Sequence, residues 1–119
     1  MTTRVLIVDD HPVFRSLATG LLRSGGYDVV GEAADGSAAL QANRHLHPDV
    51  VLLDIQLPDV DGCQVAKQLA AEANPPTVVL ISSREAIDYG SRIETCGARG
   101  FLSKAELSNA SLNALLNHE

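Results

Sequence analysis

The sequence predicts an α/β protein in which five β-strands alternate with five α-helices. Short apolar runs alternate along the chain with longer amphipathic segments, and the longest runs contain no polar residue. Uninterrupted apolar runs are typical of strands that helices cover on both faces, as in a parallel sheet. Regular alternation of strand and helix then implies a doubly wound sheet with right-handed crossovers.

Five apolar runs mark the expected strands. The continuous ones are Val5–Val8, Val50–Leu53 and Val78–Ile81, whereas Val29–Val30 and Phe101–Leu102 are shorter. We therefore expect the three continuous runs to form the covered strands and the two short runs to form edge strands.

Five amphipathic segments mark the expected helices. In the first, apolar residues from Phe14 to Leu22 recur at helical spacing, and Ser24–Gly26 ends the helix. Ser108 is a plausible N-cap of the last helix. The other three helices are expected over Gly36–Leu46, Gly62–Ala73 and Glu85–Cys96.

Length and composition restrict the class of protein. The 119 residues make one domain, and 9 basic against 15 acidic residues give a net charge of -6. Without a basic cluster, the chain is a poor candidate for binding nucleic acid or an anionic membrane by itself. It contains no signal peptide and no apolar stretch of the ~20 residues that a membrane helix needs, so we expect a cytoplasmic protein. Cys63 and Cys96 show no metal-binding spacing, and we expect two free thiols.

Polar side chains follow four of the expected strands. In an open parallel sheet, the binding site lies outside the carboxyl ends of the strands. The residues at these ends supply carboxylates, hydroxyls and an ammonium group: Asp9, Asp10, Asp54, Ser82, Ser83 and Lys104.

The clustered carboxylates indicate metal-assisted phosphoryl chemistry. Three carboxylates crowded together repel one another, and a hard cation such as Mg²⁺ removes this repulsion. A carboxylate beside the metal can attack a phosphoryl group and form an acyl phosphate. Asp54 is the best nucleophile because its strand is the most continuously apolar. Lys104 and the metal would neutralise the transferred oxygens, and Ser82 could donate a hydrogen bond to one of them.

Five motifs in order resemble the receiver domain of bacterial two-component response regulators. They are "VLIVDDHPVFR", "GEAADG", "PDVVLLDIQLPDVDG", "VVLISSRE" and "GARGFLSKAEL". The resemblance covers essentially the whole chain and is strongest to the subfamily with a LuxR-type helix-turn-helix output domain. It implies a flavodoxin-like (βα)5 fold with strand order 2-1-3-4-5. It also implies one receiver domain over residues 1–119, either stand-alone or excised from a longer regulator with a C-terminal DNA-binding domain.

The resemblance implies the acceptor and the metal ligands. Asp54 matches the phosphoacceptor, and Asp9, Asp10 and Asp54 match the Mg²⁺ carboxylates. The backbone carbonyl of Gln56 matches the remaining protein ligand.

The resemblance also implies switch and control residues. Ser82 matches the switch hydroxyl, Phe101 the switch aromatic and Lys104 the site lysine. Gln56 and Arg84 match positions that flank the path of the water that removes the phosphoryl group. The family often has proline after the lysine, whereas this chain has alanine, which leaves the local backbone geometry open.

The implied function is signalling rather than turnover of an external substrate. The phosphoryl donor would be a sensor histidine kinase, and the domain would catalyse only its own phosphorylation and dephosphorylation. Phosphorylation would change the surface of the last two βα units and could drive homodimerisation. DNA would be reached only through an output domain that this chain lacks, and no membrane partner is expected.

Three other functions compete with signalling, and the third of them is rejected. A flavin- or nucleotide-binding protein would need a phosphate loop after the first strand, where this chain has "DDHPVF". A pseudo-receiver would have lost site residues, and none is lost. A dehalogenase-type phosphatase is suggested by "DVDG", but Asp59 and Asp61 lie past the strand and favour a loop and helix start instead.

His11 is interpreted as a surface loop residue.

Overall fold

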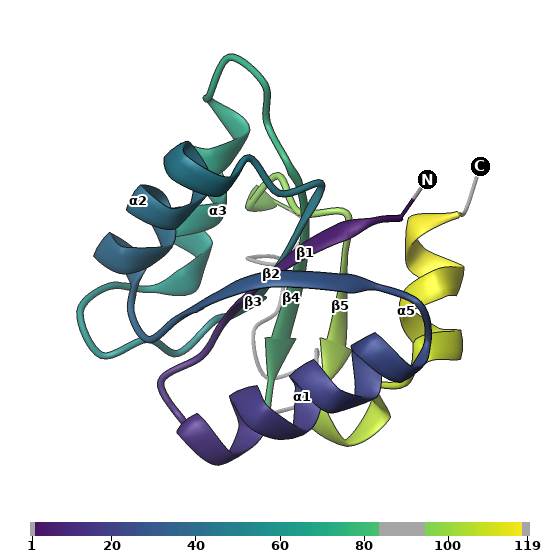
Figure 1. Cartoon of the computed structure of the whole chain (residues 1–119). Helices are drawn as coiled ribbons and strands as arrows, with labels where there is room; N and C mark the ends of the chain where they lie inside the picture. The colour runs from purple at the N-terminus through teal and green to yellow at the C-terminus, as the bar shows by residue number, and fades with distance from the viewer. Residues whose placement is uncertain (1, 84–94, 118–119) are drawn as a thin grey trace.

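The computed structural model describes residues 2–83 and 95–117, and they form one parallel sheet with helices on both faces (Figure 1). The strand order is β2-β1-β3-β4-β5, as the resemblance implied. The two short apolar runs lie in the two edge strands, as predicted. In chain order the elements are β1 (Arg4–Val8), α1 (Pro12–Ser24), β2 (Asp28–Ala33), α2 (Gly36–Leu46), β3 (Val50–Asp54), α3 (Gly62–Ala70), β4 (Thr77–Ser82), β5 (Gly100–Ser103), the 3-10 helix η2 (Lys104–Glu106) and α5 (Asn109–Leu116).

The expected elements recur with small changes at their ends. The third helix ends at Ala70 instead of Ala73, where the chain turns toward Pro75 and Pro76. The predicted helix Glu85–Cys96 falls mostly on residues 84–94, outside the described residues. None of the helices described is long and apolar enough to cross a membrane.

Alternate side chains of the central strands enter two separate cores. On the face toward α2 and α3, Leu6, Leu53 and Leu80 belong to one buried cluster. On the other face, Ile7 and Leu52 join a second cluster, which includes side chains of α1 and α5. Figure 1 shows these helix pairs on opposite sides of the sheet. Burial on both faces explains why these strands contain no polar alternation.

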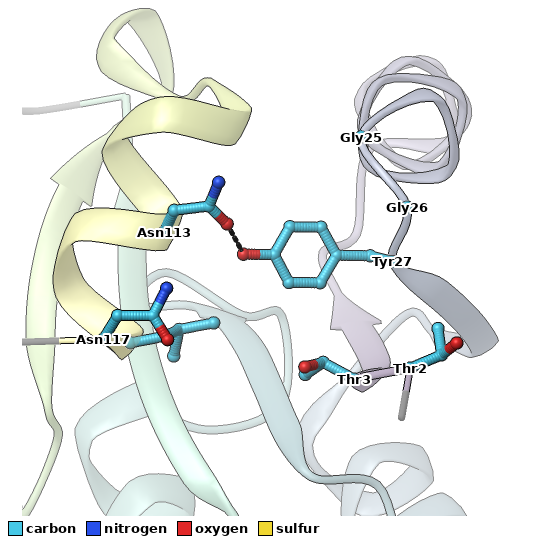
Figure 2. Close-up of a pocket in the computed structure, with 8 residues that line it drawn as sticks. Thr2, Thr3, Gly25, Gly26, Tyr27, Asn113 and Asn117 are labelled. Atoms are coloured by element: carbon cyan, nitrogen blue, oxygen red, sulfur yellow. Dashed lines mark hydrogen bonds between the residues drawn. The ribbon is translucent and has the colours of Figure 1, made fainter.

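A tertiary hydrogen bond holds α5 against the turn between α1 and β2. The Tyr27 hydroxyl donates to Asn113 Oδ1 across a polar pocket of about 250 Å³ (Figure 2). At the other end of α5, Asn109 Nδ2 donates to the Leu21 carbonyl at 3.0 Å. Gly25 packs so closely on Asn109 that a Cβ there would overlap its side chain. These contacts fix the helix that follows the Lys104 loop.

The two cysteines are not free thiols. The structure joins Cys63, at the start of α3, to Cys96, in the turn before β5, in a disulfide with the Cα atoms 5.2 Å apart. This corrects the sequence-based expectation. The two residues are 33 positions apart, and only the packing of α3 beside that turn brings them together.

Candidate functional site

The carboxyl ends of four strands deliver polar groups to one edge of the sheet. Asp54 is the last residue of β3 and pairs with Ile81, and Ser82 at the end of β4 pairs with Ser103. Asp9 follows β1, and its amide donates to the Ala33 carbonyl at 3.0 Å. Asp9, Asp54 and Ser82 are only 0%, 3% and 0% exposed. The predicted convergence of these residues is therefore present.

Lys104 lies between the two buried carboxylates. Its Nζ is 2.6 Å from Asp9 Oδ2 and 3.3 Å from Asp54 Oδ2, and its side chain is 16% exposed. The backbone before it is held because Ser103 Oγ donates to Glu106 Oε1 at 2.9 Å. All described peptide bonds are trans, including the one from Lys104 to the alanine that replaces the family's proline.

Ionisation of the acidic residues reflects burial and this lysine. Burial is the largest influence on Asp54 and raises its pKa to about 6, aided by the Asp9 charge and opposed by the Gln56 amide and Lys104. Burial also acts to raise the pKa of Asp9, but bonds from Lys104 and the His11 amide outweigh it and the pKa is lowered. The pKa of Lys104 is raised, because its bonds to Asp9 and Asp54 outweigh its own burial. The site thus holds one firmly ionised carboxylate and one that resists ionisation.

The acidic cluster has the donor set of a hard-cation site. Ligand atoms of Asp9, Asp10, His11 and Asp54 all lie within 4.8 Å of one another. Asp9 Oδ2 lies 2.6 Å from Lys104 Nζ, and Asp10 Oδ1 lies 3.1 Å from His11 Nδ1. Clustered carboxylate oxygens are the ligands that Mg²⁺ takes, so these residues fit that ion. Gln56, whose carbonyl was predicted as a ligand, stands beside them, and its amide donates to Asp54 Oδ1 at 3.0 Å.

His11, before α1, and Arg15, in its first turn, contact the acidic residues that follow β1. His11 Nδ1 is 3.1 Å from an oxygen of Asp9 and of Asp10, so His11 is part of the acidic cluster although it is exposed. Arg15 Nη1 donates to the Asp9 carbonyl at 2.6 Å, while its Nε binds Glu32 at 3.0 Å. Arg15 therefore holds the backbone of Asp9 against β2.

Phe14 is a site contact that sequence reasoning missed. Lys104 Nζ lies 4.5 Å from the centroid of the Phe14 ring, close enough for a cation–π interaction. From the sequence, Phe14 was predicted only to lie on the apolar face of its helix. A signal was present, because Phe14 stands in the first turn after the acidic loop.

Asp59 and Asp61 stay outside the acidic cluster and stabilise helix starts, as their loop position suggested. Asp61 is the N-cap of α3, and its Oδ1 accepts the Cys63 amide at 2.7 Å. Asp59 caps the other helix, α2, by accepting the Gly36 and Ser37 amides at 2.8 and 3.1 Å. These amides lower the pKa of Asp59, and the Gly36 bond has the largest effect.

The predicted switch residues occupy different environments. Ser82 is fully buried at the end of β4. Phe101, in β5, is half-buried and packs against the core cluster on the α2 and α3 face. Arg84 lies outside the described residues.

Comparisons with known proteins agree with this geometry. The family described as response regulator receiver domain matches residues 5–117. The chain is 42% identical over 117 residues to the "Probable transcriptional regulatory protein NarL" of Mycobacterium tuberculosis, which covers 96% of this chain and 53% of that protein. It is 31% identical over 110 residues to the "DNA-binding transcriptional activator EvgA" of Escherichia coli, which covers 92% of this chain and 54% of that protein.

Solved structures show the same fold. The signal receiver domain of NarL from Mycobacterium tuberculosis superposes with a TM-score of 0.85 at 38% identity and covers 98% of each chain. A LuxR-family two-component response regulator from Aurantimonas gives 0.84 at 29% identity, covering 98% of this chain and 86% of that one. The chain spans about half the length of the curated relatives it matches. It belongs to the response regulator receiver domain family of two-component systems, among relatives that regulate transcription.

Proposed function

We propose that this domain accepts a phosphoryl group on Asp54 from a sensor histidine kinase in the cytoplasm and converts it into a change of its surface. The observation that carries the proposal is Lys104 Nζ lying 2.6 Å from Asp9 Oδ2 and 3.3 Å from Asp54 Oδ2. A partly buried cation beside a buried nucleophile suits the negative charge of a transferring phosphoryl group.

Asp54 is the nucleophile of the transfer. One of its carboxylate oxygens forms a bond to phosphorus while the bond from phosphorus to the donor imidazole nitrogen breaks. Lys104 pairs with an oxygen of the transferred group, and Asp9 keeps the lysine charged. When bound by Asp9, Asp10, Asp54 and the Gln56 carbonyl, Mg²⁺ would neutralise charge on the same oxygens.

The phosphoryl group is then lost from Asp54 by hydrolysis. Water attacks phosphorus and the Asp54 oxygen leaves as a carboxylate. Gln56 is an exposed side chain two residues past the acceptor, where it can obstruct that water. Arg84 is assigned the same role from the resemblance alone, and together these long side chains favour slow loss.

The output is read through Ser82 and Phe101. The phosphoryl group brings about -1.5 to -2 charge and three acceptor oxygens. Lys104 and the metal account for two of these oxygens, and Ser82, at the end of the neighbouring strand, can donate to the third. Movement of Ser82 toward the phosphoryl group would let Phe101 turn further into the core. The changed surface would serve a second copy of the domain or a DNA-binding output domain in the full-length regulator.

The test is incubation with Mg²⁺ and a small acyl phosphate, followed by intact mass measurement. Wild type should gain one phosphoryl group and Asp54→Ala none. Asp59→Ala is the matched control, since that acid caps α2 and should leave the gain intact. A phosphoryl group on Asp54→Ala would refute the assignment.

The readout has its own experiment. Ser82→Ala should bind a phosphoryl mimic such as beryllofluoride and yet lose the amide shift changes around Phe101. The same changes in Ser82→Ala and wild type would remove the hydroxyl from the mechanism.

A further inference from the structure

The Cys63–Cys96 pair is a covalent feature that the proposed function does not use. The two residues are only 7% and 1% exposed, and their Cα atoms are 5.2 Å apart. That separation lies within the range of about 4.4–6.8 Å that disulfides need. The backbone around the two residues is therefore compatible with a disulfide.

One end of the pair adjoins the phosphoacceptor. Cys63 is the second residue of α3, and Gly62 before it packs so closely on the Asp54 carbonyl that a Cβ at Gly62 would overlap it. The Gly62 amide also donates to the Ile55 carbonyl at 2.6 Å. A constraint on Cys63 is thus passed to the end of β3 through backbone contacts.

The other end adjoins the strand that carries the switch aromatic. After Cys96 the chain turns at Gly97, whose φ of 80° requires glycine, and the Arg99 amide donates to the Val78 carbonyl at 2.7 Å. Strand β5 with Phe101 follows at once. Both cysteines lie in the buried cluster against which Phe101 packs.

We propose that Cys63 and Cys96 are a site of reversible thiol–disulfide exchange, whose oxidised form weakens the response of the domain to a phosphoryl group. The reaction partner is a dithiol, either a small molecule or a protein. A thiolate of the dithiol attacks the Cys63 sulfur, which belongs to the more exposed residue, and the Cys63–Cys96 bond breaks. Cys96 leaves as a thiolate and takes a proton. The second thiol of the dithiol then displaces Cys63, so the dithiol is oxidised and the pair gains two electrons and two protons.

The direction of the effect follows from linkage. The disulfide fastens the start of α3 to the segment before β5 in the arrangement seen here, in which Lys104 is paired with both Asp9 and Asp54. A covalent tie that fits one arrangement favours it over any other. The proposed switch moves Phe101 within the buried cluster that contains both cysteines, so the oxidised form is expected to oppose the switch and the reduced form to permit it. This regulatory part rests on the proposed function, whereas the exchange site itself does not.

The exchange site is tested without phosphorylation. The protein is equilibrated with mixtures of reduced and oxidised dithiothreitol, quenched with acid, unfolded, alkylated and weighed. Two alkyl groups should be added at the reduced end and none at the oxidised end, reversibly, without covalent dimers on a non-reducing gel. The oxidised form should melt about 10 °C or more above the reduced form. Two free thiols throughout, or dimers in place of the internal bond, would overturn the site.

The coupling is tested with beryllofluoride and Mg²⁺, followed by fluorine NMR. Oxidised and reduced wild type have the same sequence, so they are matched controls for each other. The oxidised form should bind the mimic roughly 5-fold or more weakly. Cys96→Ser should bind like the reduced form whether or not oxidant is present. Equal or tighter binding by the oxidised form refutes the coupling and leaves the proposed function standing, whereas no binding by either form refutes the proposed function and the coupling with it.

Discussion

The middle of the sheet and its carboxyl edge are built from the same strands with opposite side chains. In β3, Val51, Leu52 and Leu53 are fully buried and apolar, and Asp54 follows them with only 3% of its surface exposed. Burial of an apolar side chain stabilises the folded state. Burial of a carboxylate removes its hydration and destabilises the folded state unless ion pairs and hydrogen bonds replace the lost water. The partners of Asp54 are Lys104 and the Gln56 amide, but burial outweighs them and raises the pKa of Asp54 to about 6. The middle therefore stabilises the fold, whereas the edge holds a buried carboxylate at a cost in stability.

The largest effect should come from the middle. Leu52→Ala removes a fully buried side chain from the core on the α1 and α5 face and should lower the free energy of unfolding by about 3 kcal/mol or more. Urea denaturation measures it. Leu17→Ala is the control, since Leu17 is 68% exposed and its truncation should change the value by about 0.5 kcal/mol or less. Similar losses in both variants would contradict the division between core and surface.

At the edge, removing a charge should stabilise the fold. The pKa of Asp54 is about 6 in the folded protein against 3.8 for the ordinary side chain. The folded state thus holds this proton more tightly than the unfolded state, so the free energy of unfolding falls as pH rises from about 4 to about 6. Asp54→Asn lacks this fall and should be more stable than wild type by roughly 1–3 kcal/mol above pH 7 without divalent cations.

The measurement is urea denaturation of both proteins in EDTA at several pH values. The difference between them should shrink as the pH falls and approach zero near about pH 3, where Asp54 is protonated in both states. A gain that is the same at all pH values would mean that packing, not ionisation, distinguishes the variants.

Asp10 allows a test of whether the carboxyl edge of the sheet binds a metal ion. Asp10 contributes a carboxylate to the acidic cluster, and its Oδ1 lies 3.1 Å from His11 Nδ1. Asp10→Asn should weaken Mg²⁺ binding roughly 10-fold or more, measured by titration calorimetry. Asp28→Asn changes an exposed acid at the opposite end of the sheet and should leave the affinity unchanged. If both variants bind Mg²⁺ like wild type, Asp10 is a residue of the loop after β1 and not a metal ligand.

The middle of the sheet was more predictable from sequence than the contacts around its edge. Uninterrupted runs such as Val50–Leu53 indicate covered strands, and parallel strands bring their carboxyl ends together, so Asp9, Asp54 and Lys104 could be placed at one site. Their assigned roles in phosphoryl transfer remain predictions.

What sequence could not show depends on how helices sit on the sheet. Phe14 meets Lys104 because α1 lies beside the loop after β5, and Asp59 caps α2 rather than the nearer α3. The Cys63–Cys96 contact likewise arises from packing between elements 33 residues apart. Periodicity in a single helix carries no information on such contacts.

The smallest effect should come from Phe14, where the apolar core and the charged edge meet. Its ring lies 4.5 Å from Lys104 Nζ, and a partly exposed cation–π contact contributes about 0.5–1 kcal/mol. If the ring positions Lys104 for the phosphoryl group, Phe14→Leu should slow phosphorylation by acyl phosphate roughly 2- to 5-fold, since that free energy is lost at the transition state. Phe14→Tyr keeps the aromatic face and should restore the rate. NMR titration of the Lys104 ammonium separates positioning from packing: Phe14→Leu should lower its pKa while Leu17→Ala leaves it unchanged. A slower Phe14→Leu with an unaltered Lys104 pKa, not rescued by tyrosine, would assign Phe14 to packing alone.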